Sequence, residues 1–155
     1  PAEMAKITMA GGELLAAVKK VAPGWSIRNC GQDMDPGLKG SFRGRKNVLL
    51  THPLSRLSPC VLYRTVQVPA GKTALKFGVS HSEKGDWELV VKADRRELLR
   101  KPITKETVGE SGWSDVEVDL SAFAGKSVKL ELLNIPTGWQ YEAGYWSKIE
   151  ISTRP

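Results

Sequence analysis

The sequence predicts an all-β fold, an antiparallel jelly-roll β-sandwich of about eight strands with a short N-terminal helix. Residues 113–120 show the pattern most clearly, because Val116, Val118 and Leu120 alternate with acidic residues. A period of two is typical of a strand with one buried and one solvated side. The same alternation recurs from residue 47 onward, between short breaks that contain Gly or Pro. Strands of this length and spacing are typical of two-layer sandwiches.

The N-terminal segment 12–22 carries a helical pattern instead. Its apolar stripe consists of Leu14, Leu15, Val18 and Val21. The Pro23-Gly24 pair ends the pattern, although a segment this short leaves a strand open as an alternative. Residues 25–46 are rich in Gly, Asp and Arg without clear periodicity, so we predict a long loop. A loop of this length is uncommon unless it binds, caps or wraps something.

Eight strands are predicted after this loop. They span residues 47–51, 60–68, 73–81, 87–93, 97–103, 113–120, 128–135 and 145–152. Within the fifth of these strands, Pro102 cannot donate a ladder hydrogen bond. This strand is therefore expected at a sheet edge, or to end early.

The connections between these strands predict where recognition takes place. If consecutive strands run antiparallel, their connections alternate between the two ends of the sandwich. The connections that then share one end are 52–59, 82–86, 104–112 and 136–144. They are long and polar and carry aromatic residues, and loops of this kind on a rigid scaffold are where binding sites concentrate.

Length and composition bound the domain organisation. With 155 residues, of which 41% are apolar and 26% charged, we expect a single domain spanning 1–155. Residues 1–24 are its helical lead-in and 25–46 its long loop. Because the chain starts at Pro1, we expect a domain excised from a larger protein, with a neighbouring domain as a partner. No apolar run approaches the length of a membrane span, so no membrane partner is predicted.

The charge balance favours anionic partners. The net charge is +6, from 23 basic and 17 acidic side chains. An ordinary basic surface accounts for this excess as well. The denser basic groups, 43–46 and 95–96, are too short for a nucleic-acid-binding arm, so no nucleic-acid partner is predicted.

Two cysteines, Cys30 and Cys60, leave two interpretations open. An even count is compatible with one disulfide in an oxidising compartment. The alternative is a pair of reduced, buried thiols, because two cysteines make no disulfide framework.

The sequence gives little indication of catalysis. The chain has no Gly-x-Ser-x-Gly elbow, no phosphate-cradling glycine loop and no His-Glu-x-x-His motif. The two cysteines and two histidines lack paired metal-ligand spacing, so zinc is not expected. No carboxylate pair stands out for glycoside cleavage. The chain is therefore predicted not to be an enzyme and to require no cofactor.

Several motifs resemble those of the galactose-binding-like β-sandwich modules, which include carbohydrate-binding modules. They are V-P-A-G-K, G-D-W-E-L-V-V, W-S-D-V-E-V-D-L-S-A-F-A-G-K and E-A-G-Y-W-S-K-I-E-I, between residues 68 and 151. The upstream C-G-Q-D-M-D-P-G-L and N-V-L-L-T-H-P look like additions found in such domains of bacterial extracellular proteins. The resemblance implies a jelly roll that binds sugars beside a functional domain, often with a structural calcium ion. Its motifs are mostly structural and assign no ligand set.

The candidate ligand-binding residues come from the loops and strand ends that are predicted to converge. They are His52, Arg56, His81, Asp86, Trp87, Trp139, Tyr141 and Glu142. An exposed aromatic ring such as Trp139 can stack on the apolar C–H face of a pyranose, while polar neighbours hold its hydroxyls. The alternatives are that Trp139 covers the core and that Trp87, in phase with Leu89, belongs to the core.

The sequence contains one candidate calcium site. Asp33 and Asp35 offer hard oxygen ligands two positions apart in D-M-D-P-G, with Glu142 or Glu150 as distant ligands. The later positions of the usual calcium loop are missing, and Asp-Pro-Gly is also an ordinary turn.

These observations together predict a non-catalytic carbohydrate-binding module, secreted to the periplasm or the cell exterior. Its ligand is expected to be a polysaccharide, acidic or sulfated in view of the basic charge, bound at the loops of one end. The alternative is a structural or protein-interaction β-sandwich that accompanies an enzyme or another functional domain.

Overall fold

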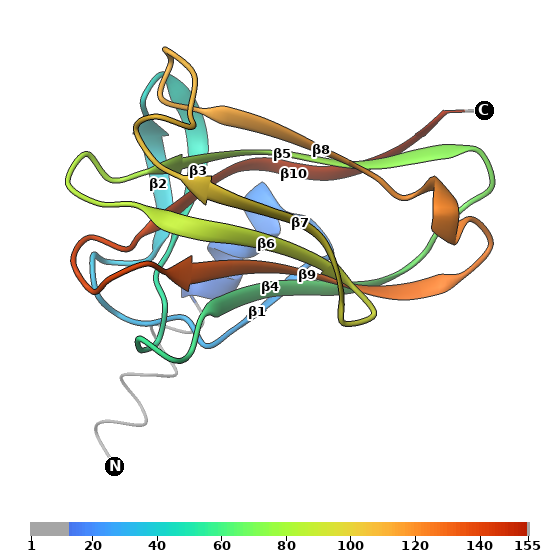
Figure 1. The fold of residues 1–155 in the computed structure, drawn as a ribbon, viewed down its shortest axis with the longest axis horizontal. Helices are drawn as coiled ribbons and strands as arrows, with labels where there is room; N and C mark the ends of the chain where they lie inside the picture. Colours follow the sequence, from blue (N-terminus) through green and yellow to red (C-terminus); the bar gives the residue numbers. More distant parts are fainter. Residues whose placement is uncertain (1–12, 155) are drawn as a thin grey trace.

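A computed structural model describes residues 13–154, which form two five-stranded antiparallel sheets packed face to face (Figure 1). The first sheet contains, in spatial order, β1 (Ser26–Arg28), β4 (Cys60–Gln67), β9 (Ser127–Pro136), β6 (Trp87–Ala93) and β7 (Arg96–Ile103). The second contains β2 (Gly37–Phe42), β3 (Arg45–Thr51), β10 (Gly144–Arg154), β5 (Lys72–His81) and β8 (Ser114–Asp119). A 3₁₀ turn, η1 (Ser121–Phe123), follows β8. The predicted all-β sandwich is confirmed.

The predicted loop 25–46 is wrong in part, because it contains β1 and β2. Strand β1 has three residues and pairs with β4, while β2 forms a hairpin with β3 across a turn at Arg43 and Gly44. Both turn residues have positive φ, 47° and 83°, which suits a tight hairpin. Neither strand alternates cleanly between apolar and polar residues, so periodicity could not reveal them.

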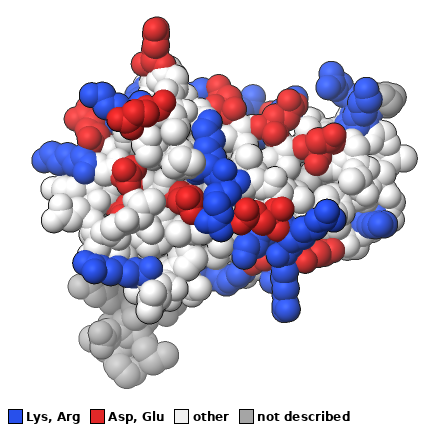
Figure 2. Space-filling view, in the orientation of Figure 1, with Lys and Arg blue, Asp and Glu red and all other residues white. Residues whose placement is uncertain are grey.

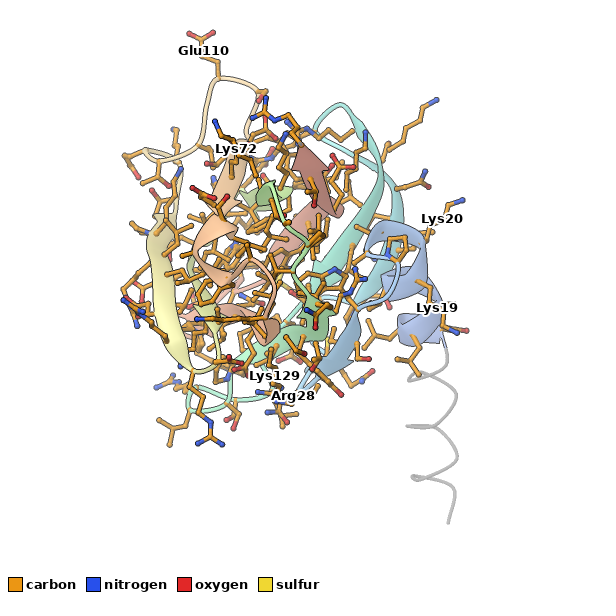
Figure 3. All side chains as sticks on the ribbon, turned by 90° about the vertical axis from the view of Figure 1, so that its right-hand side faces the viewer. Lys19, Lys20, Arg28, Lys72, Glu110 and Lys129 are labelled. Atoms are coloured by element: carbon orange, nitrogen blue, oxygen red, sulfur yellow. The ribbon has the colours of Figure 1, made fainter. Side chains whose placement is uncertain are left out.

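The segment 13–21 is helical, as predicted, and residues 1–12 of the expected lead-in lie outside the described part of the chain. Leu14, Val18 and Val21 are buried in the main core, and Ala17 joins them. Leu15, predicted in the same stripe, is 48% exposed. The helix closes the open side of the sandwich beside β1, β2 and β3, and Lys19 and Lys20 point away from the core (Figure 3).

Strand β10 contains a bulge that fixes which side chains enter the core. Its pairing with β5 shifts between Ser147 and Glu150, and Lys148 within the bulge has a φ of 47°. The extra residue places both Trp146 and Ile149 in the core, which strict alternation would not allow. The indole of Trp146 donates a hydrogen bond to the Thr51 hydroxyl at 2.8 Å.

The β2–β3 hairpin builds a second apolar cluster on the outer face of the second sheet. This cluster consists of Val48, Leu50, Trp113, Ala143 and Tyr145, with Met34 and Phe42 packed against it. The ring of Phe42 stacks on Tyr145 with 3.8 Å between centroids. The packing of Phe42 on Tyr145 therefore anchors the hairpin on the sheet.

Basic and acidic side chains are interspersed on the face of the molecule shown in Figure 2. The excess of basic residues therefore forms no continuous patch on this face. Within residues 13–154, no helix is long and apolar enough to cross a membrane.

Candidate functional site at the loop end

Four loops meet at one end of the sandwich, which we call the loop end (Figure 1). They are residues 52–59, 82–86, 104–113 and 137–143, the connections β3–β4, β5–β6, β7–β8 and β9–β10. Because all strand pairs within the sheets are antiparallel, alternate connections return to the same end. A cavity of about 540 Å³ beside His81 and Glu83 is also lined by the third of these loops. The predicted convergence is confirmed.

Trp139 and His52 are in contact at the loop end. Their rings meet edge to face, with centroids 5.5 Å apart and an interplanar angle of 86°. His52 is buried and its Nδ1 donates to the carbonyl oxygen of Pro53 at 2.8 Å, which fixes the imidazole. Trp139 is half-buried, so part of its indole is open to solvent. His52 thus packs against the Trp139 ring and restrains it.

Tyr141 supplies the second aromatic ring of the loop end. It is 42% exposed, and Lys84 Nζ lies 5.5 Å from the ring centroid. A Cβ at Gly85 would collide with the carbonyl oxygen of Tyr141. The loops 82–86 and 137–143 are therefore packed backbone against backbone, an approach that glycine permits.

A carboxylate braces the loop that carries both rings. Glu142 is buried, and its Oε1 accepts a hydrogen bond from the backbone N–H of Gly138. Burial raises the pKa of Glu142, and the nearby charge of Asp86 acts in the same direction. The Glu142 Oε2 atom is buried without a hydrogen-bond partner among the described residues. Asp86 accepts a hydrogen bond from the Thr137 hydroxyl, which joins the two loops again.

Burial divides the predicted ligand-binding residues into two groups. Arg56 and Tyr141 are exposed and Asp86 and Trp139 are half-buried, whereas the others are buried. The buried ones are His52, His81, Trp87 and Glu142. These four residues support the loop end and present little surface to a ligand.

Trp87 has to be withdrawn from the predicted contact residues. Its side chain is fully buried in the main core, and its indole N–H donates to the Ser80 carbonyl at 2.9 Å. His81 lies directly beneath the 82–86 loop, where Nδ1 is 2.7 Å from the Ser82 carbonyl oxygen and 2.9 Å from that of Gly85. His81 therefore holds that loop in place.

Sequence reasoning missed three residues that are presented at the loop end. Leu54 and Leu57 are 52% and 93% exposed in the loop 52–59, and Lys84 lies over the Tyr141 ring. The sequence P-L-S-R-L-S-P could have indicated the two leucines. It places two apolar side chains in a segment that is bounded by prolines and lacks strand periodicity. Large exposed apolar side chains that cluster mark interaction surfaces.

The predicted calcium ligands Asp33 and Asp35 are exposed in the turn before β2. Asp35 pairs with Lys39 Nζ at 3.4 Å. Among residues 13–154, no three His, Cys, Asp or Glu side chains gather so that they could hold a metal ion. A calcium ion at Asp33 and Asp35 would therefore depend on backbone carbonyls and water for its remaining ligands, and stays a prediction.

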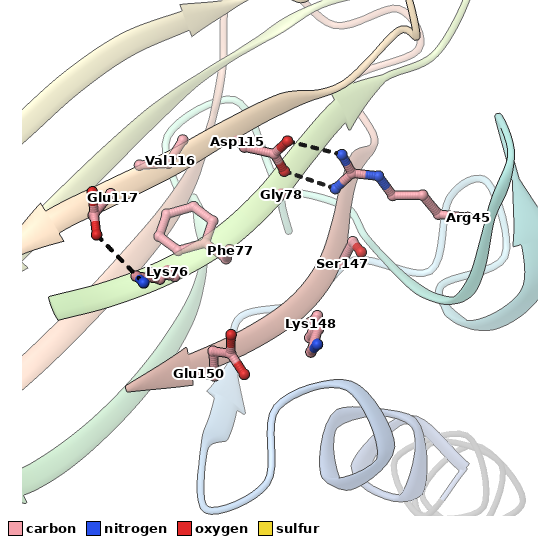
Figure 4. A pocket seen from close by; sticks show the side chains of 10 residues that line it. All are labelled: Arg45, Lys76, Phe77, Gly78, Asp115, Val116, Glu117, Ser147, Lys148 and Glu150. Carbon is pink, nitrogen blue, oxygen red and sulfur yellow. Dashed lines mark hydrogen bonds and ion pairs between the residues drawn. The ribbon is translucent and has the colours of Figure 1, made fainter. Parts of the chain in front are cut away.

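A second candidate surface is a cavity of about 630 Å³ on the outer face of the second sheet (Figure 4). Four of its charged side chains form two ion pairs. Arg45 donates two hydrogen bonds to Asp115, at 2.9 and 3.0 Å, and Lys76 Nζ lies 3.6 Å from Glu117 Oε1. The one aromatic lining residue, Phe77, is buried in the core. This cavity therefore offers no ring for stacking on a sugar.

No family model and no curated protein sequence matches this chain. Solved structures with the same fold exist at low sequence identity. The K1 cleaved adhesin domain of Lys-gingipain from Porphyromonas gingivalis has a TM-score of 0.59 and 14% identity, over 87% of this chain and 94% of that chain.

Two carbohydrate-binding modules with bound sugars are also similar in fold. The family 61 module TmCBM61, in complex with β-1,4-galactotriose, has a TM-score of 0.56 and 12% identity, covering 88% of this chain and 92% of that chain. The family 51 module from Clostridium perfringens, in complex with methyl-galactose, has a TM-score of 0.50 and 15% identity, covering 82% and 88%. At these identities the likeness establishes the fold alone: this chain has the same β-sandwich fold as these two carbohydrate-binding modules and the gingipain adhesin domain.

Proposed function

We propose that this protein is a non-catalytic carbohydrate-binding module that binds a polysaccharide at the loop end. The observation that carries the proposal is the pair of accessible rings, Trp139 and Tyr141, on one braced loop. Trp139 is held edge-on by His52, and the 137–143 loop is held by Glu142 and Gly85. Preorganised aromatic rings bind sugars well because little side-chain freedom is lost on binding.

The two rings would contact the apolar C–H faces of the sugar units, and polar side chains around them would hold the hydroxyls. Arg56 is exposed in the loop 52–59, and Lys84 and Asp86 belong to the loop 82–86. The cations Arg56 and Lys84 suit a carboxylate or sulfate group on the glycan. This supports an acidic or sulfated polysaccharide, in keeping with the net charge of +6.

The class of sugar, the location of the protein and its neighbouring domain are also part of this proposal. Two modules of this fold are solved with galactose-based sugars, which makes galactose-containing polysaccharides the first to test. The adhesin domain of the same fold belongs to a larger protein, Lys-gingipain. We infer that this chain likewise works outside the cytoplasm beside a neighbouring domain, without catalytic activity of its own.

Affinity gel electrophoresis against neutral, acidic and sulfated polysaccharides tests this function, with calcium or a chelator in parallel lanes. We expect retardation of the wild-type protein and at least about tenfold weaker binding by Trp139→Ala, which is about 1.4 kcal/mol. Tyr63→Ala, at a half-buried tyrosine on the outer face of the first sheet, is the matched control and should bind normally. Unchanged mobility on every polysaccharide would contradict the proposal, as would equal binding by Trp139→Ala.

Tryptophan fluorescence gives an independent readout. Trp25, Trp87, Trp113 and Trp146 are at most 4% exposed, so acrylamide quenching reports mainly on the half-buried Trp139. A saturating polysaccharide should protect Trp139 from the quencher. Unchanged quenching of the wild-type protein in the presence of a polysaccharide that it binds would show that the sugar binds elsewhere.

The alternative function, a protein-interaction domain, is favoured by one observation. Leu57 is 93% exposed and Leu54 is 52% exposed in the same loop, and neither helps to contact a sugar hydroxyl. This function predicts no polysaccharide binding and greater hydrogen-exchange protection of residues 54–57 when the domain is joined to its neighbour. Leu57→Ser should abolish that protection, whereas Leu15→Ser, at a leucine of similar exposure to Leu54 on the helix, should not.

A further inference from the structure

The two cysteines are brought together directly beneath the loop end. Strand β1 pairs with β4 up to Arg28 and Val61, so Cys30 and Cys60 lie just beyond the last pair of this ladder. Asn29, between Arg28 and Cys30, has a φ of 57° and turns the chain. Both cysteines are free, and Cys30 Sγ lies 3.6 Å from the carbonyl oxygen of Gly31.

The same pair is tied to the start of the 52–59 loop. Cys30 forms a β-bridge with Pro53, and the Gly31 N–H donates to the His52 carbonyl at 2.8 Å. Cys60 pairs with Asn134 of β9, whose side-chain amide oxygen accepts a hydrogen bond from the Thr51 hydroxyl at 3.2 Å. A covalent bond here would therefore join three segments: the end of β1, the start of β4 and the residues that support Trp139.

We propose that Cys30 and Cys60 are a redox-active pair that forms an intramolecular disulfide and thereby fixes the base of the 52–59 loop. The two cysteines differ in access, because Cys30 is half-buried and Cys60 is buried. Hydrogen bonding from Cys60 lowers the pKa of Cys30, whereas burial raises the pKa of Cys60. Cys30 is therefore the thiol that reacts first, since the thiolate is the nucleophile.

The oxidant in this proposal is a small-molecule disulfide such as oxidised glutathione. The Cys30 thiolate attacks one sulfur of that disulfide, a mixed disulfide forms, and one glutathione thiolate leaves. Cys60 then gives up its proton and its thiolate attacks Cys30 Sγ, which breaks the mixed disulfide and releases the second glutathione. Two protein thiols are oxidised to one disulfide, and one glutathione disulfide is reduced to two thiols.

Intact-protein mass spectrometry after equilibration in glutathione buffers tests the pair. We expect the wild-type protein to lose about 2 Da on oxidation and to resist alkylation when it is subsequently unfolded. Cys60→Ser should stop at a glutathione adduct on Cys30, and Cys30→Ser should keep an unmodified Cys60. Wild-type protein that stays fully alkylatable, or that forms only disulfide-linked dimers, would overturn the proposal.

The melting temperature of the wild-type protein, reduced against oxidised, supplies a test that needs no variant. A disulfide between Cys30 and Cys60 closes the chain segment between them into a loop, which restricts the unfolded chain. The melting temperature of the oxidised form should therefore rise by several degrees. A mass loss without any rise would mean that the bond forms but does not hold the loop, which would overturn the second half of the proposal. Acrylamide quenching of Trp139 in both redox states reports directly on the loop.

Discussion

The indole of Trp139 lies edge to face against the imidazole of His52, with 5.5 Å between ring centroids. This contact joins the loop after β3 to the loop after β9, and it is the structural reason why Trp139 is half-buried. A ring in this position is supported on one side and accessible on the other. Rigid, partly exposed aromatic rings of this kind bind planar apolar surfaces with little loss of entropy.

His52→Ala should release Trp139 from this support. We expect acrylamide quenching of the tryptophan fluorescence to increase, because the other four tryptophans remain buried. The free energy of unfolding should fall by about 0.5–1.5 kcal/mol from loss of the aromatic pair alone. If quenching stays at the wild-type value, His52 does not position Trp139.

Gly85→Ala should separate the two loops that carry the candidate ligand contacts. An added methyl group would collide with the Tyr141 carbonyl, so we expect a loss of about 1–3 kcal/mol of stability in urea unfolding, and weaker glycan binding. Gly40→Ala is the matched control, because a Cβ there meets nothing within 4 Å. It should change stability by less than about 0.5 kcal/mol. Equal stability of the two variants would show that the loops can move apart at no cost.

Glu142→Gln should change how stability depends on pH. Since burial raises the pKa of Glu142 in the folded protein, the wild type loses stability as pH rises from the unfolded-state pKa through the folded-state pKa. Glutamine cannot ionise, so the free energy of unfolding of the variant should rise relative to that of the wild type as pH increases through this window. Urea denaturation between about pH 4 and pH 7 measures the difference. A constant difference across this range would mean that folding does not raise the pKa of Glu142.

Asp115→Asn tests the ion pair that links the β2–β3 hairpin to β8. Arg45 lowers the pKa of Asp115 by hydrogen bonding, so the stabilisation is complete above the unfolded-state pKa and is lost as pH falls through the folded-state pKa. Because Asp115 is well exposed, the variant should lose less than about 1 kcal/mol at neutral pH. The difference in free energy of unfolding between the variant and the wild type should disappear at acid pH. A difference that grows there would contradict a stabilising ion pair between Arg45 and Asp115.

Local sequence pattern was sufficient for most of the sandwich. The apolar alternation predicted all eight strands from β3 to β10 within one or two residues, because each has one face in the core. Strands β1 and β2 were not predicted because they lie at sheet edges. Their half-buried positions impose no strong alternation of apolar and polar residues. A bulge in β10, which no pattern in the neighbouring residues indicates, places Trp146 in the core.

By itself, the sequence determined the two-layer architecture and the end at which the long loops gather, since antiparallel order follows from short connections between alternating strands. Only the tertiary structure decided which loop residues face solvent. Trp87 and Trp139 are both aromatic residues beside a turn, yet one fills the core and the other is held half-open by His52. That difference arises from packing between segments distant in the chain, and so does the approach of Cys30 to Cys60 at the end of the β1–β4 ladder.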